Sequence, residues 1–178
     1  MDAVQIPKLL PDLKNANETL DHIQKKLEAY LETKRAAFPR FYFLSNDELL
    51  SILSQTRNPH AVQEHLSKCF DAINRVIFDE EEPHKILAMS DMIKERVDFA
   101  EPVIAGTVVE AWLSQIEQQM VAGLYKVSKE CFLNYPEDGT QRKEWIFGPY
   151  PAQSQIMVDQ IFWTQLAEEA LDRLNTGG

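Results

Sequence analysis

The side chains of this 178-residue chain that could bind a metal ion are scattered. Its four histidines are His22, His60, His65 and His84. No two of them have the H-E-x-x-H spacing that puts two zinc ligands on one helix face, and the two cysteines form no C-x-x-C pair. Glu80, Glu81 and Glu82 form an acidic run, but it lacks the spacing of an EF-hand calcium loop. A solvated acidic turn is therefore favoured, and no metal ligand is predicted.

Motifs for phosphate binding and nucleophilic catalysis are absent from the sequence. It contains no G-x-x-x-x-G-K-[ST] loop, no G-x-G-x-x-G turn and no G-x-S-x-G nucleophile elbow. With six glycines in total, the chain has little material for a loop that cradles phosphates. The sequence predicts no catalytic residue, no cofactor-binding residue and no cofactor, so we do not expect this chain to be an enzyme.

Charge and hydropathy restrict the kinds of partner that this chain could bind. Acidic residues outnumber basic ones 28 to 18, which argues against binding a nucleic acid backbone. A charged, solubilising exterior is favoured over a surface for a basic partner. The apolar runs are far shorter than the roughly 20 residues of a membrane span, and no secretory signal opens the chain, so an intracellular protein is expected. In that setting Cys69 and Cys131 are expected to be buried, reduced thiols.

Hydrophobic periodicity predicts a mainly α fold. Helices are expected over residues of about 12–36, 46–56, 59–75, 107–133 and 152–174, with a short helix around Arg142–Ile146 that carries Trp145. In 12–36, an a/d heptad pattern is formed by Leu13, Ala16, Leu20, Ile23, Leu27 and Tyr30. This seam spans too few heptads for a free coiled coil, so we expect it to pack against another helix of this chain.

Local signals mark where several of these helices begin. Ser45 and Glu48 have the spacing of a capping box, and so do Thr107 and Glu110. Asn58 and Pro59 predict a cap followed by the first helical residue.

Apolar stripes predict the buried faces. They are Val62, Leu66, Cys69, Ile73 and Val76 in 59–75; Val109, Trp112, Ile116, Met120, Gly123, Val127 and Cys131 in 107–133; and Val158, Ile161, Phe162, Leu166 and Ala170 in 152–174. Trp112 and Trp163 are expected to be core anchors, whereas Glu169 and Arg173 read as an exposed i,i+4 pair.

The middle of the chain breaks the helical pattern. The runs RVIFD at 75–79, KILAM at 85–89 and RVDF at 96–99 predict a small β-hairpin or three-stranded meander over residues 76–100. The alternative is an irregular helix over 89–99. Because a lone hairpin is marginal in water, it must pack on the helices.

The segment FPRFYFLSNDELL at residues 38–50 has four aromatic side chains within six residues: Phe38, Phe41, Tyr42 and Phe43. One interpretation places Phe38, Phe41 and Phe43 in the core, between the helices over 12–36 and 46–56. The other makes part of the run a docking surface. An extended, alternating conformation would bury one side of it, and this favours the core.

Four blocks, in order, resemble the linker region (N-terminal region 2) of the dynein heavy chains. They are LEAYLETKRAAFPRFYFLSNDELLSILSQTRNP at 27–59, AVQEHLSKCFDAINRVIF at 61–78, EAWLSQIEQQM at 110–120 and QSQIMVDQIFWTQLAEEAL at 153–171. The first block is highly specific for the family. Its amino-acid sequence is most similar to that of axonemal dyneins, among them inner-arm chains. Asp159 and Ala167 replace the serine and valine usual in the family, and Gly148–Pro151 stands near a segment often written W-P-G-Q.

The resemblance implies that residues 1–178 are a fragment of a dynein heavy-chain linker. This mostly helical element is non-catalytic and transmits ATP-driven changes of the ATPase ring into a power stroke. Its implied partners are the rest of the heavy chain in cis and other dynein subunits, with microtubules reached only through the parent motor and no nucleic acid or membrane. The implied location is the cytoplasm and cytoskeleton, in the axoneme of a cilium or flagellum.

Pro39 and the segment 148–151 are candidate soft joints, with plain helix ends as the simpler interpretation. The competing hypothesis is an autonomous acidic helical adaptor for protein–protein interaction.

Overall fold

The computed structural model describes residues 8–55, 58–136 and 141–176. In chain order, the elements are α1 (Leu9–Ala37), the 3₁₀ helix η2 (Pro39–Phe43), α2 (Asn46–Ser54), the 3₁₀ helix η3 (Pro59–Val62), α3 (Gln63–Cys69), β1 (Arg75–Phe78), β2 (Lys85–Ser90), β3 (Arg96–Ile104), α4 (Val109–Leu133), α5 (Arg142–Ile146) and α6 (Ala152–Thr176). The mainly α class with a small sheet is confirmed.

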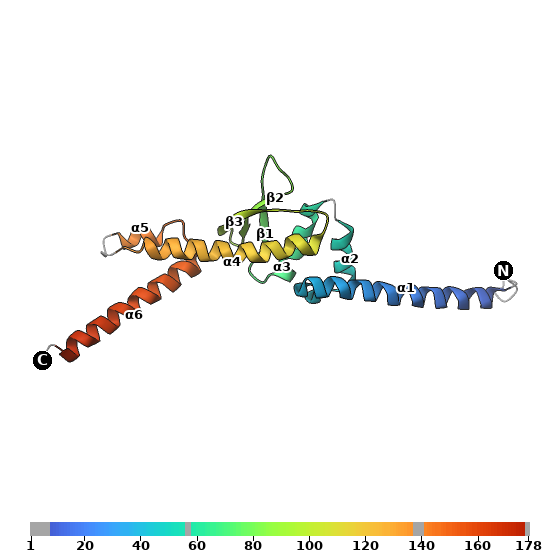
Figure 1. The fold of residues 1–178 in the computed structure, drawn as a ribbon, viewed down its shortest axis with the longest axis horizontal. Coiled ribbons are helices and arrows are strands. Elements are labelled where there is room, and N and C mark those ends of the chain that lie inside the picture. Colours follow the sequence, from blue (N-terminus) through green and yellow to red (C-terminus); the bar gives the residue numbers. More distant parts are fainter. Residues whose placement is uncertain (1–7, 56–57, 137–140, 177–178) are drawn as a thin grey trace.

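The molecule has a central body from which two long helices project in opposite directions (Figure 1). The body contains the sheet, the short helices and α4, which lies alongside β3. Helix α1 leads away toward the N-terminal end, and α6 leads away toward the C-terminal end. At about 1.5 Å per residue, the 29 residues of α1 span roughly 43 Å.

The sheet is an antiparallel meander in the order β1-β2-β3, as the first of the two interpretations predicted. The alternative prediction, an irregular helix over 89–99, is wrong. A tight turn reverses the chain there, because the Lys94 amide donates to the carbonyl of Asp91 and the Glu95 amide donates to the Asp91 carboxylate, at 3.3 and 2.8 Å.

Glycine at position 123 allows α4 to lie directly on β3. A Cβ placed on Gly123 would come within 2.6 Å of the carbonyl oxygen of Asp98 in β3. One helical turn earlier, the side chain of Gln119 accepts a hydrogen bond from the Glu101 amide of the same strand, at 2.9 Å. Helix and sheet therefore form one packed unit.

The third predicted helix is shorter than the expected range of 59–75. It begins as η3, where Pro59 takes the first position but Asn58 makes no side-chain cap, and α3 ends at Cys69. Ile73 and Val76 are buried as expected, but Ile73 lies in the following loop and Val76 in β1. The residues from 75 onward pair with β2, so they form a strand. The apolar spacing that predicted a helix up to residue 75 continues there only by coincidence, and strand pairing overrides it.

Two hydrophobic clusters of different size hold the described residues together. The larger contains 22 buried residues from every element between α1 and α4, and the smaller contains only Cys131, Trp145 and Val158. The smaller cluster joins the end of α4 to α5 and α6. The predicted helix over Arg142–Ile146 is confirmed, and its Trp145 is buried.

Candidate functional site

The aromatic run forms a junction in which every third residue is buried. Phe38, Phe41 and Leu44 are almost completely buried, because 39–43 is a 3₁₀ helix, in which residues three apart share a face. Phe38 and Phe41 meet edge to face with ring centroids 5.0 Å apart. The core interpretation is therefore confirmed for Phe38 and Phe41, but Phe43 is 73% exposed. The predicted alternating, extended conformation was wrong.

Arg40, within this junction, ties three parts of the body together. Its guanidinium donates to Glu117 of α4 at 3.0 Å and to the carbonyl of Cys69 at 3.1 Å. It also lies over the ring of Phe70, 4.8 Å from the centroid. A planar, multidentate cation on an aromatic face is a geometry that lysine would not reproduce. The sequence contained a signal for this role, namely a single arginine inside an aromatic run.

A second tie joins α1 to α4. The ammonium of Lys34 donates to the carboxylate of Glu110 at 2.6 Å, and this hydrogen bond raises the pKa of the Lys34 ammonium. Glu110 therefore does not reach back to Thr107, and the predicted capping box at Thr107 is wrong: α4 begins after Val108 without a side-chain cap.

The other predicted capping box is present. The hydroxyl of Ser45 accepts from the Glu48 amide, and the Glu48 carboxylate accepts from the Ser45 amide. The same carboxylate also accepts from the ammonium of Lys68 in α3. The Lys68 hydrogen bond and the Ser45 amide together lower the pKa of Glu48 to about 2. The box thus connects α2 to α3 as well as starting α2.

The heptad seam of α1 faces solvent, in contrast to the predicted packing within this chain. Leu20 is 63% exposed, and its neighbours on the seam are exposed as well: Leu13, Ala16, Ile23, Leu27 and Tyr30. Leu31, one residue beyond the seam, is the only buried residue of α1. The body reaches only the last turns of this helix, so most of its apolar stripe projects beyond the body (Figure 1).

Helix α6 is attached to the body mainly through its first turns. Its buried residues are Ser154, whose hydroxyl lies 2.9 Å from that of Ser128, and Val158. Phe162, which is partly buried, stacks on Tyr135 with centroids 3.9 Å apart. Apart from Val158 and Phe162, the predicted stripe of α6 is wrong, and so is the anchor role of Trp163. The side chains concerned are exposed: Ile161, Trp163, Leu166 and Ala170.

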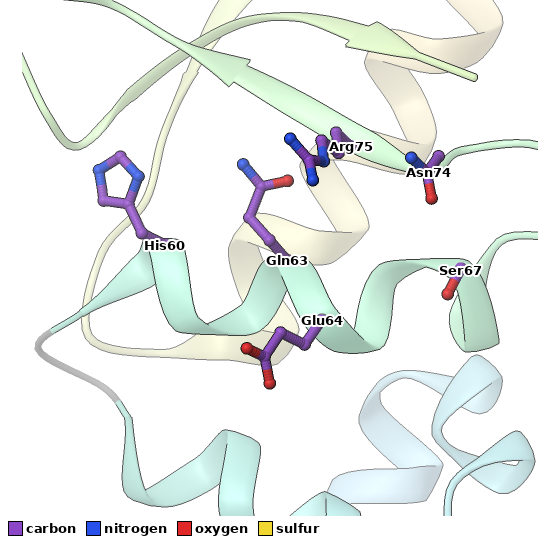
Figure 2. A pocket seen from close by; sticks show the side chains of 6 residues that line it. All are labelled: His60, Gln63, Glu64, Ser67, Asn74 and Arg75. Carbon is purple, nitrogen blue, oxygen red and sulfur yellow. The ribbon is translucent and has the colours of Figure 1, made fainter. Parts of the chain in front are cut away.

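A polar hollow of about 420 Å³ lies between α3 and the start of β1 (Figure 2). Gln63 spans it by bonding both the amide and the carbonyl of Val76, at 3.0 and 2.9 Å. His60 is close to the carbonyl of Pro83 at 3.1 Å and lies on the ring of Phe78. Figure 2 shows the Glu64 side chain turned away from Gln63, so the lining groups do not converge on one point. This arrangement protects the edge of β1 and contains no nucleophile paired with a base.

Within the ranges that the structure describes, no group of three or more histidine, cysteine, aspartate or glutamate side chains could hold a metal ion. Cys69 and Cys131 are free and buried, as predicted. Burial raises the pKa of the Cys69 thiol to about 11 and also raises that of Cys131. Among the described helices, none is long and apolar enough to cross a membrane.

Comparison with known proteins identifies the family. The family model described as "Dynein heavy chain, N-terminal region 2" matches residues 1–131. The chain is 44% identical over 183 aligned residues to human dynein axonemal heavy chain 6, and the alignment covers 93% of this chain. It is 42% identical over 168 residues to human dynein axonemal heavy chain 1 and 41% identical over 178 residues to rat dynein axonemal heavy chain 12, covering 94% and 98% of this chain.

These alignments cover only 4% of the length of the two human relatives and 6% of the rat relative. The matched residues include the aromatic junction, the sheet and most of α4. The chain belongs to the dynein heavy chain family, in its N-terminal region 2.

Proposed function

We propose that this chain is a non-catalytic, load-bearing segment of the linker of an axonemal dynein heavy chain. The observation that carries the proposal is the combination of family membership with two long helices that project from one packed body. Neither 12–36 nor 152–176 contains a glycine or proline, so each projecting helix is uninterrupted. As part of such a motor, the chain would work on axonemal microtubules in a cilium or flagellum through the parent protein.

The contacts trace a path along which force can pass. At one end, Lys34 and Arg40 bind Glu110 and Glu117, which lie about two turns apart on α4. At the other end, Ser128 of α4 meets the first turns of α6. Helix α4 therefore contacts both projecting helices, and its close approach to β3 stiffens α4 between these two contacts.

The exposed seam of α1 supports the rest of the heavy chain as the partner in cis. An apolar stripe from Leu13 to Tyr30, roughly 26 Å long, is unusual on a solvated helix and has the pattern that packs against other helices. Its flanking positions carry mostly uncharged side chains, such as Asn17, Thr19 and Gln24, instead of the charge pairs of a free-standing coiled coil. This composition fits a helix bundle better than a two-stranded dimer.

The experiment replaces Leu20 and Ile23 by glutamine in the full heavy chain and measures microtubule gliding and ATP turnover separately. We expect gliding to slow while ATP turnover without microtubules is retained, because the seam transmits movement and takes no part in hydrolysis. The matched control replaces Glu18 and Lys25, on the opposite face of α1, by glutamine.

Gliding at the unaltered speed in the seam variant would contradict the linker role and favour the adaptor hypothesis. A second measurement is titration of the 178-residue chain with ATP in a calorimeter. We expect no heat of binding, and saturable binding would contradict the non-catalytic role.

A further inference from the structure

An apolar hollow of about 310 Å³ lies at the root of α6, away from the seam of α1. Its walls come from the loop before β1, the β2–β3 hairpin, α4 and the start of α6. The apolar lining consists of Ala72, Ile73, Met89, Val97, Met120, Leu124 and Pro151. A volume of this size accommodates one large side chain, the kind of anchor that dominates many protein interfaces.

The polar lining of the hollow includes two carboxylates and no cation. Asp91 and Glu95 line the hollow, together with the neutral side chains of Ser90, Gln153 and Ser154, and no lysine, arginine or histidine does. One oxygen of Asp91 accepts from the Glu95 amide at 2.8 Å, and one oxygen of Glu95 accepts from the Ala152 amide at 2.7 Å. Neither carboxylate has an ion-pair partner among the described residues. The carboxylates are thus held in place, and each keeps an oxygen for an incoming cation.

The surface next to Asp91 and Glu95 is apolar and lies on a tight turn. Met92 and Ile93 form the tip of the β2–β3 hairpin and are 85% and 82% exposed. Hairpin tips usually carry glycine, asparagine or aspartate, and here Lys94 adopts a left-handed backbone conformation with φ of 69° to complete the turn. Local strain that presents large apolar side chains to solvent is typical of recognition sites.

We propose that this hollow binds an apolar side chain of a partner protein segment that is flanked by lysine or arginine. The apolar side chain enters between Met120 and Leu124, and the flanking cations meet Asp91 and Glu95. Two methionines in the lining give the walls the adaptability that irregular partners require. The net charge of −10 adds a long-range attraction for a basic segment.

The test uses isotope-labelled 178-residue chain and the peptide acetyl-Arg-Phe-Arg-amide, followed by amide chemical shifts. We expect saturable shifts at the lining residues and weak or absent shifts with acetyl-Glu-Phe-Glu-amide and acetyl-Arg-Gly-Arg-amide. The double variant D91N/E95Q keeps the oxygens that accept the two amides, and it should weaken binding about fivefold or more.

A blocking variant separates the hollow from the rest of the surface. Leu124→Lys places a cation in the lining and should abolish the shifts, whereas Leu133→Lys, on the same helix and outside the hollow, should leave them intact. Equal binding of the three peptides, shifts that map elsewhere, or binding unchanged in Leu124→Lys would each overturn the proposal. Because the wild-type chain alone distinguishes the peptides, a variant that fails to fold leaves the conclusion intact.

Discussion

Replacement of Phe41 by alanine tests whether the aromatic junction holds α1 and the body together. Phe41 is fully buried, and complete burial of such a side chain is worth about 2–3 kcal/mol. The edge-to-face contact with Phe38 adds about 0.5–1.5 kcal/mol, and the cavity left behind adds more. Together these terms predict a loss of about 3–5 kcal/mol in the free energy of unfolding.

The assay is urea denaturation followed by circular dichroism, with Phe43→Ala as the matched control. Phe43 belongs to the same 3₁₀ helix and the same residue type but is largely exposed, so its replacement should change stability by no more than about 0.5 kcal/mol. At about 2–4 °C per kcal/mol for a chain of this size, Phe41→Ala should lower the melting temperature by roughly 6–20 °C. Equal stability of the two variants would refute the assignment of Phe41 to the core.

Three further predictions concern packing, pH and thiol reactivity. Gly123→Ala should destabilise the chain by about 1–3 kcal/mol in the same assay, because the added methyl group meets a strand carbonyl, whereas Gly106→Ala has open space and should be neutral. The folded-state pKa of Glu48 is about 2 and lies below its unfolded value. Its stabilising contribution is therefore fully present above about pH 4.5 and lost as the pH falls toward 2. Glu48→Gln should flatten the fall in melting temperature over that range, and an unchanged acid profile would show that the interaction is unimportant. Cys69 and Cys131 should react with iodoacetamide at pH 8 only after denaturation, because both thiols are buried and their pKa values are raised. Rapid alkylation of the native chain, read by mass spectrometry, would contradict the packing of α3 and α4.

The sequence predicted best those features that neighbouring residues determine. The capping box at Ser45 and Glu48 and the helix around Trp145 depend on contacts within a few residues, and the meander over 76–100 pairs strands that follow one another along the chain. All three are present. The long helices were also predicted, with ends displaced by up to three residues.

Predictions that depended on a distant partner were less successful. Thr107 and Glu110 have the same spacing as Ser45 and Glu48, yet Lys34, 76 residues away, takes the Glu110 carboxylate. The predicted packing of the α1 seam within this chain was wrong, because periodicity shows only that a face is apolar and does not identify what covers it. The role of Arg40 in joining α3 and α4 was not predicted, because its partners Glu117 and Phe70 are remote in sequence.

The two candidate joints differ in how firmly the structure closes them. Around Pro39, the junction shares the large cluster of 22 buried residues and has hydrogen bonds from Arg40 to both α3 and α4. Around 148–151, the second cluster has three buried residues, and α6 leaves the body after about three turns. Since resistance to bending grows with buried contact, we expect movement of α6 relative to α4 to require less free energy than movement of α1. We therefore expect Pro39 to be a plain helix end, and we expect the soft joint of the proposed linker segment to lie at the root of α6.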